Sequence, residues 1–123
     1  MELKQNPIRI LFFAAIALLI ILPFWGGMAS ADNHGEGAAV FAQYKCGMCH
    51  TIEGVRGAMG MMGPNLTTYG TQDQILGTAE MTQENLIQFI GNPGSIKPGS
   101  MMPGFKMSDE DAAALADYLM SLE

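Results

Sequence analysis

The sequence predicts an all-α fold, a small domain of three to four helices preceded by an N-terminal signal or anchor helix. Three observations lead to this fold class. An uninterrupted apolar run, Ile10–Leu22, stands near the start of the chain. Further on, Thr82 and Ser108 each precede apolar residues at helical spacing, as capping residues do. Between these parts, residues 51–70 are rich in glycine and methionine and keep no sustained period, which predicts irregular chain wrapped around something.

The first 31 residues are expected to be either a cleaved signal peptide or a retained membrane anchor. Lys4 and Arg9 precede the apolar run, which has the length of a secretory core. If Pro23–Met28 extends that run, residues 10–28 can reach into a membrane as an anchor, whereas Ala29–Ala31 is a small-residue cleavage pattern. Positive charge before the run keeps the amino terminus in the cytoplasm. Both alternatives therefore predict a domain in the periplasm or on the outer face of the cytoplasmic membrane.

The net charge and the cysteine content limit the partners and the type of domain that the chain can have. The 123 residues include 12 acidic and 6 basic side chains, which argues against nucleic acid as a partner and favours a protein partner with a basic patch. Residues 32–36 are expected to be a polar linker, in which His34 has no specific role, and residues 37–123 one domain. The two cysteines belong to one motif, so no disulfide framework is available.

The domain is predicted to begin and end with helices that pack together. Residues 38–45 form a short helix with Val40, Phe41 and Tyr44 on one face. Ser108, followed by three acidic residues at the positive end of the helix dipole, begins the last helix. Its apolar face needs a partner, and the helix before the cysteine motif is the natural one.

A third helix is predicted between two loops. Thr82 caps a helix over residues 83–90, and Gly91–Gly94 ends it. Residues 70–77 and 95–107 carry no helical or strand period and are predicted as loops.

The stretch Cys46-Gly47-Met48-Cys49-His50 has the pattern by which a polypeptide holds haem covalently. Cys46 and Cys49 are three positions apart, so they lie on one side of a helical turn and can both form thioethers to a single porphyrin. His50 follows directly and can give an imidazole nitrogen to the iron. The sequence therefore predicts one covalent haem c bound by Cys46, Cys49 and His50.

A second partner of the histidine is expected in Gly63-Pro64-Asn65-Leu66. Pro64 has no amide hydrogen, but its carbonyl can accept a hydrogen bond from the far nitrogen of an axial histidine. By itself Pro64 would be an ordinary turn proline. Beside the haem motif, we predict that it orients His50.

Iron held by His50 alone would leave a sixth position open, and the side chains that could close it in this chain are methionines. Met102 is the preferred candidate, since Pro103 stiffens its loop and the loop lies far enough from His50 to reach the opposite face. Met101 stays open as the alternative, and only one of the two neighbours can face the iron. Three methionines close to His50 are expected to line the pocket or lie on the surface: Met59, Met61 and Met62.

In this order, the motifs resemble those of single-haem class I cytochromes c, and look most like the cytochrome c domain fused to subunit II of some haem-copper oxidases. The resemblance covers about residues 36–123. It rests on Cys46–His50, Gly63–Leu66, Asn92-Pro93, Lys97–Gly99, Met102-Pro103 and Tyr118-Leu119. It implies a cytochrome c fold with His50 and Met102 as axial ligands and Pro64 accepting from His50. It also implies that Phe41 packs against Tyr118 where the terminal helices cross.

The sequence departs from that family near the haem propionates. Members often carry arginines or a tryptophan there, whereas this chain has Tyr69-Gly70-Thr71-Gln72, which makes Tyr69 and Gln72 the candidates. Leu66 is expected among the cofactor-binding residues. The chain has neither the copper-site cysteines nor the paired membrane helices of an oxidase subunit II, so the resemblance implies a separate carrier or a small subunit.

These features predict a one-electron carrier of a respiratory or photosynthetic chain and not an enzyme. Its expected partners are redox proteins such as a terminal oxidase or a quinol-oxidising complex. Two other classes stay open on the sequence. One is an enzyme or gas sensor with an open sixth position, for which no distal histidine, arginine or acid–base pair is evident. The other is a dithiol or zinc site without haem at Cys46, Cys49 and His50.

Overall fold

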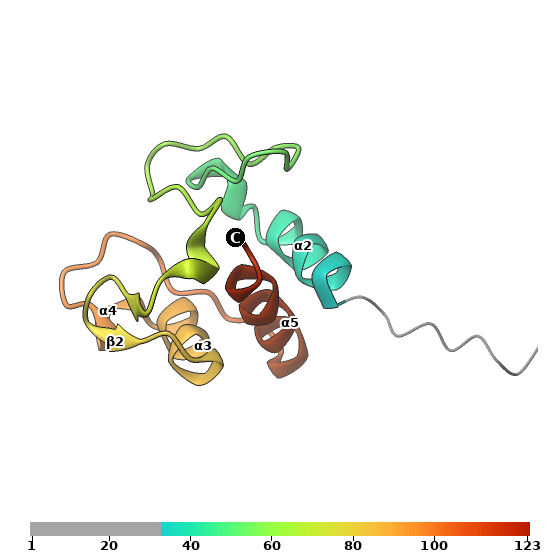
Figure 1. The fold of residues 1–123 in the computed structure, drawn as a ribbon. Helices are drawn as coiled ribbons and strands as arrows, with labels where there is room; N and C mark the ends of the chain where they lie inside the picture. Colours follow the sequence, from blue (N-terminus) through green and yellow to red (C-terminus); the bar gives the residue numbers. More distant parts are fainter. Residues whose placement is uncertain (1–32) are drawn as a thin grey trace, which may run out of the picture. The chain divides into compact units, whose positions relative to one another are not determined.

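The computed structural model describes residues 33–123, and the predicted signal or anchor over residues 1–31 lies outside this part of the chain. The described part contains four α-helices, which confirms the all-α fold class (Figure 1). They are α2 (Asn33–Gln43), α3 (Gln83–Gly91), α4 (Pro93–Ile96) and α5 (Asp109–Met120). Two 3-10 turns and one small hairpin join them: η2 (Cys46–Met48), η3 (Tyr69–Thr71), β1 (Gln74–Ile75) and β2 (Ala79–Glu80).

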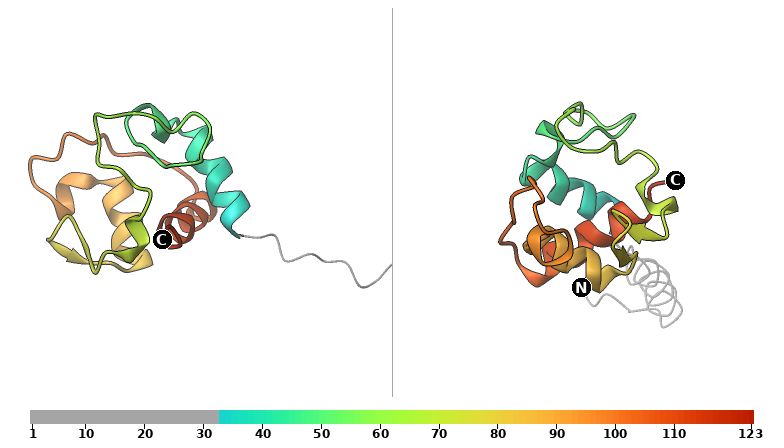
Figure 2. Two further views of the ribbon diagram at one scale, coloured as in Figure 1. Left: turned by 45° about the horizontal axis from the view of Figure 1, so that its top comes forward. Right: turned by 90° about the vertical axis from the view of Figure 1, so that its left-hand side faces the viewer.

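The helices α2 and α5 cross in direct contact. In Figures 1 and 2, α5 lies between α2 and α3, and it packs against both. Gly37 lies at the crossing, where a side chain would collide with the carbonyl oxygen of Ala114 and the Cβ of Tyr118. The Phe41 and Tyr118 rings meet edge to face, with centroids 6.4 Å apart. The predicted packing of Phe41 on Tyr118 is therefore confirmed.

Both predicted helix caps are present. The Thr82 hydroxyl oxygen accepts from the backbone N–H of Asn85 (3.2 Å), and the Ser108 hydroxyl oxygen accepts from that of Asp111 (3.1 Å). Each bond satisfies a donor that the first turn of a helix leaves free. The buried face of α3 consists of Leu86, Phe89 and Ile90.

Three local features differ from the prediction. Helix α2 begins at Asn33, so residues 33–36, which were expected as linker, are helical; Glu36 in its first turn suits the positive end of the helix dipole. The predicted loop over residues 70–77 contains part of η3 and the strand β1. After α3 the chain does not remain a loop, because Pro93, whose fixed φ suits the first helical position, starts the one-turn helix α4.

Backbone hydrogen bonds hold the irregular chain between the motif and η3 in place. Gly60 N–H donates to the carbonyl of Gly47 (3.0 Å), and Leu66 N–H donates to that of Thr51 (2.8 Å). The carboxyl terminus fixes η3, since Gly70 N–H donates to the Leu122 carbonyl (2.8 Å). Across residues 33–123 we find no helix with the length and apolarity needed to span a bilayer.

Candidate functional site

The cysteine motif stands on a tight turn directly after α2. Lys45 adopts a left-handed conformation (φ 56°, ψ 32°) and turns the chain into the 3-10 helix η2. A 3-10 helix has three residues per turn, so Cys46 and Cys49 lie one above the other. Their backbones are joined by the Cys49 N–H, which donates to the Cys46 carbonyl (3.1 Å), and His50 N–H donates to the same oxygen (3.0 Å). Both thiols and the imidazole therefore come from one short, hydrogen-bonded segment.

The His50 ring is held by the segment that follows the motif. Its Nδ1 lies 2.9 Å from the Pro64 carbonyl oxygen, which can only accept, so Nδ1 carries the proton. The other ring nitrogen, Nε2, is thereby the one with a free lone pair. Gly63 packs against the ring face: a Cβ on this residue would lie 2.7 Å from Nδ1 and 2.9 Å from Nε2. The hydrogen bond and this close approach fix the orientation of the imidazole.

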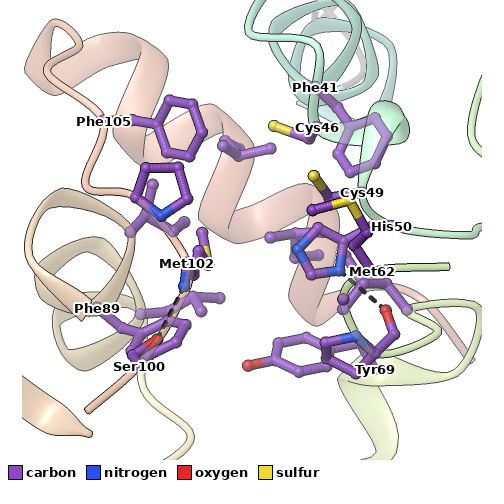
Figure 3. A pocket seen from close by; sticks show the side chains of 18 of the residues that line it. Phe41, Cys46, Cys49, His50, Met62, Tyr69, Phe89, Ser100, Met102 and Phe105 are labelled. Atoms are coloured by element: carbon purple, nitrogen blue, oxygen red, sulfur yellow. Dashed lines mark hydrogen bonds between the residues drawn. The ribbon is translucent and has the colours of Figure 1, made fainter. Parts of the chain in front are cut away.

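Met102 faces His50 from the other side of a cavity (Figure 3). Its backbone N–H donates to the Ser100 hydroxyl oxygen (3.3 Å), and the side chain is half-buried against the core. Met101 is 93% exposed. Met101 also lines the cavity, so the two neighbours differ in burial and not in access to the cavity.

The loop that carries Met102 is tied to α3 and to Tyr44, the residue that follows α2. Phe105 N–H donates to the Ile90 carbonyl (3.0 Å), and the Phe105 ring meets Tyr44 edge to face at 6.4 Å. The Tyr44 hydroxyl in turn donates to a carboxylate oxygen of Asp111 (3.2 Å). The far wall of the cavity is therefore anchored directly to α3 and, through Tyr44, to α5.

The cavity has a volume of about 310 Å³ and is lined mainly by apolar side chains. Among the described residues that line it, Lys45 is the only one of the Lys, Arg, Asp and Glu type. A pocket of this size with few polar groups suits a large apolar ligand. The thiols of Cys46 and Cys49 lie on the same wall as His50, opposite Met102 (Figure 3).

The structure brings all seven predicted site residues to this cavity: Cys46, Cys49, His50, Pro64, Leu66, Tyr69 and Met102. The candidate Gln72 is exposed and is not among the lining residues. The three methionines near His50, Met59, Met61 and Met62, are all exposed on the surface, and Met62 also lines the cavity.

Several lining residues were not predicted for the site. They come from the buried faces of the helices and from two loops: Phe41, Leu76, Leu86, Phe89, Ile90, Phe105, Leu115 and Leu119. The helical ones carry a burial signal in the sequence, but that signal does not distinguish a side chain that faces the core from one that faces a cofactor. Leu76 has no such signal, because the hairpin that holds it was not predicted.

The pKa of the Cys46 thiol can be compared with what a redox-active dithiol without haem would need. Burial raises the pKa of the Cys46 thiol; a hydrogen bond from its own backbone lowers it, and the nearby Cys49 raises it. The thiols of redox-active Cys-x-x-Cys motifs have lowered pKa values, so the shift at Cys46 runs in the wrong direction for a dithiol. Within residues 33–123, no group of three or more His, Cys, Asp or Glu side chains is arranged to hold a metal ion.

A covalent haem fits these residues. The cavity is apolar and of suitable size, two thiols stand at one wall, and an oriented histidine and a methionine face each other across it. These features define a small helical domain built around one covalent porphyrin.

Comparison with known proteins gives the family. The family model for cytochrome c matches residues 35–123, and the chain belongs to the cytochrome c family. It carries one covalent haem c, and its family membership indicates an electron-transfer protein. The predicted resemblance to class I cytochromes c, and to the cytochrome c domain of oxidase subunit II, is confirmed.

Three relatives are named cytochrome c oxidase subunit 2. The protein of Bacillus subtilis is 34% identical over 99 residues, which cover 77% of this chain and 28% of the relative. That of Alkalihalophilus pseudofirmus is 39% identical over 89 residues, covering 72% and 25%. That of Bacillus sp. (strain PS3) is 37% identical over 92 residues, covering 72% and 26%. The chain thus spans about a quarter of the length of these relatives.

A solved structure agrees with the fold. The crystal structure of the c-type cytochrome SorU from Sinorhizobium meliloti has a TM-score of 0.52 and 23% identity to this chain. The match covers 74% of this chain and 91% of SorU. At this identity the likeness supports the cytochrome c fold and nothing more.

Proposed function

We propose that the protein is a one-electron carrier whose haem c is six-coordinate, with His50 and Met102 as the axial ligands. Cys46 and Cys49 would hold the porphyrin by thioether bonds. When bound, haem c supplies a reversible one-electron couple at its iron. The chain's own residues supply the ligands, the orientation and the apolar surroundings.

The observation that supports this proposal is the pairing of His50 with Met102 across one apolar cavity. The Pro64 carbonyl fixes the proton on Nδ1 and leaves Nε2 for the iron. Met102 presents a thioether from the opposite wall, on a loop anchored through Phe105. Two strong ligands keep the iron six-coordinate in both oxidation states, so little has to rearrange when the electron moves, and the thioether raises the reduction potential.

We propose an oxidase-type complex as the electron acceptor, because the relatives named above are oxidase subunits. Residues 1–31 would direct the domain to the periplasm or hold it at the outer face of the cytoplasmic membrane. The excess of 12 acidic over 6 basic residues would steer it toward a basic partner surface. Association should then weaken as ionic strength rises.

The ligand assignment is tested by two matched variants of the holoprotein, Met102→Ala and Met101→Ala. We expect M102A to lose the weak absorption band of sulfur-ligated ferric haem and to have a lower reduction potential, because the thioether favours the reduced form. Met101 is 93% exposed, so M101A should keep both properties.

The opposite pattern, with the band lost only in M101A, would move the ligand to Met101. A high-spin spectrum of the wild-type holoprotein would contradict the closed sixth position and favour the sensor or enzyme class.

A further inference from the structure

The hairpin between η3 and α3 ends in an unusual turn. Leu76, Gly77 and Thr78 connect β1 to β2, and the first two of them have positive φ, at 50° and 69°. The turn is closed by the Thr78 N–H, which donates to the Ile75 carbonyl (3.0 Å). Positive φ at both central positions is the pattern of a type I′ turn, which prefers Asn, Asp or Gly at its first position. Here that position is occupied by Leu76.

Leucine is a poor residue for this conformation. Its Cβ crowds the following carbonyl when φ is positive, and it lacks the polar side chain with which Asn or Asp compensates locally. In the described part of the chain, Lys45 is the only other non-glycine residue with positive φ. Both residues line the same cavity. Backbone strain of this kind persists where the surroundings impose it, and it gathers at functional sites.

The rest of the hairpin holds Leu76 in place. Ile75 is completely buried (0% exposed) and anchors the turn in the core, and the Met81 N–H donates to the Asp73 carbonyl (2.9 Å) across the base of the hairpin. Leu76 itself lines the cavity, yet 39% of it is exposed. It therefore stands at the mouth, between the interior of the cavity and solvent.

We propose that Leu76 is kept in this conformation to cover the edge of the bound haem and exclude water from it. This inference rests on the proposed function, because it concerns the haem edge of the carrier. The oxidised iron centre carries one more positive charge than the reduced one, so an apolar cover disfavours the oxidised form. Leu76 thereby raises the reduction potential, as the apolar shell around a metal site does in general.

The test is the variant Leu76→Asn, measured in the holoprotein. Asparagine is close to leucine in size and suits the turn, so the melting temperature should stay the same or rise. Its polar amide admits water, so the reduction potential should fall. At a fixed ambient potential we expect the ratio of oxidised to reduced protein to rise several-fold, where a tenfold change corresponds to about 59 mV for one electron. A residue with only a structural role would not move stability and potential in opposite directions.

Three further variants make the outcome decisive. Leu76→Gly removes both the strain and the cover, so it should repeat the fall in potential. Leu76→Met keeps an apolar cover and should keep the wild-type potential. Gln74→Ala is the control in the same hairpin, since Gln74 is exposed and is not among the lining residues.

Two results would overturn the inference. One is a potential that is unchanged in both L76N and L76G. The other is loss of the sulfur-ligation band in L76N, which would mean that Leu76 holds the ligand and does not cover the edge. If the wild-type protein itself lacks that band, the proposed Met102 ligand is refuted. The role of Leu76 would still be decided by comparing the reduction potentials of the wild type and the Leu76 variants.

Discussion

The crossing of α2 and α5 depends on a single glycine, and Gly37→Ala tests that dependence. A methyl group at this position would collide with the Ala114 carbonyl oxygen and the Tyr118 Cβ, and would lie 3.0 Å from the Ala114 carbonyl carbon. Two of these atoms are backbone and the third is a Cβ, so none can turn aside as the end of a flexible side chain would. The substitution therefore forces the helices apart or bends one of them.

Two opposing effects set the change in free energy of unfolding that Gly37→Ala causes. Overpacking a close contact costs about 1–3 kcal/mol, and the rigid neighbours of Gly37 place this site near the upper value. Replacing glycine by alanine inside a helix returns about 1 kcal/mol through helix propensity. The net loss in free energy of unfolding is therefore about 2 kcal/mol. For a domain of this size, that lowers the melting temperature by about 8–16 °C.

The assay is thermal unfolding of the oxidised holoprotein, followed by far-ultraviolet circular dichroism. Gly35→Ala is the matched control, because Gly35 is in the same helix and has no atom within 4 Å of the added methyl. We expect G35A to melt at or above the wild-type temperature. Equal melting temperatures for G35A and G37A would refute the close crossing.

Two further predictions concern the walls of the cavity. Gly63→Ala places a methyl against the His50 ring, so we expect a loss of about 1–3 kcal/mol in unfolding free energy and an altered haem spectrum, measured by denaturation and absorption. Burial raises the pKa of Tyr69 above its ordinary value of 10.0, so the unfolded chain releases this proton first as pH rises. The contribution of Tyr69 to folding stability is therefore fully present below about pH 10 and decreases as pH rises above it, and Tyr69→Phe should make this alkaline decrease less steep in denaturant titrations.

Each of these predictions has a result that contradicts it. Gly94→Ala is the control for G63A, since its methyl would meet only the Asn92 Oδ1, at an ordinary 3.7 Å. A G63A protein with wild-type spectrum and stability would show that the ring is not held by Gly63. For Tyr69, the contrary result is a Y69F variant whose stability falls above pH 10 as steeply as that of the wild type.

The elements that the sequence predicted correctly are those with local chemical signals. Thr82 and Ser108 are effective caps by themselves, and each accepts the expected backbone hydrogen bond. The start of α2 was missed because Asn33–Glu36 contains a glycine and polar residues, which predict linker as readily as helix. The packing of α2 on α5 favours a helix over a linker, and this tertiary contact leaves no signal in the local sequence.

Placement of the site residues was predictable to the extent that it depends on short spacing. Cys46, Cys49 and His50 meet because they share one turn, and Pro64 reaches His50 over a separation of only 14 residues. Met102 was chosen from loop chemistry and resemblance, and it lies on the wall opposite His50. The remaining walls come from helices distant in sequence, whose relative positions follow from tertiary packing that a single sequence does not display.

The hairpin formed by β1 and β2 was not predicted, because its turn lacks the residues that usually mark such a turn in a sequence. A turn with Asn-Gly between its strands predicts a hairpin from sequence, because both residues tolerate positive φ. This chain has Leu76-Gly77 instead, so the signal is absent while the turn is formed. Lys45, the other residue in this conformation within the described residues, bends the chain from α2 into the cysteine motif. At both positions the residue present is one that local backbone preference disfavours, and both residues line the same cavity. Such conflicts between local preference and structure are expected at functional sites, where a bound group and not the turn determines which residue is present.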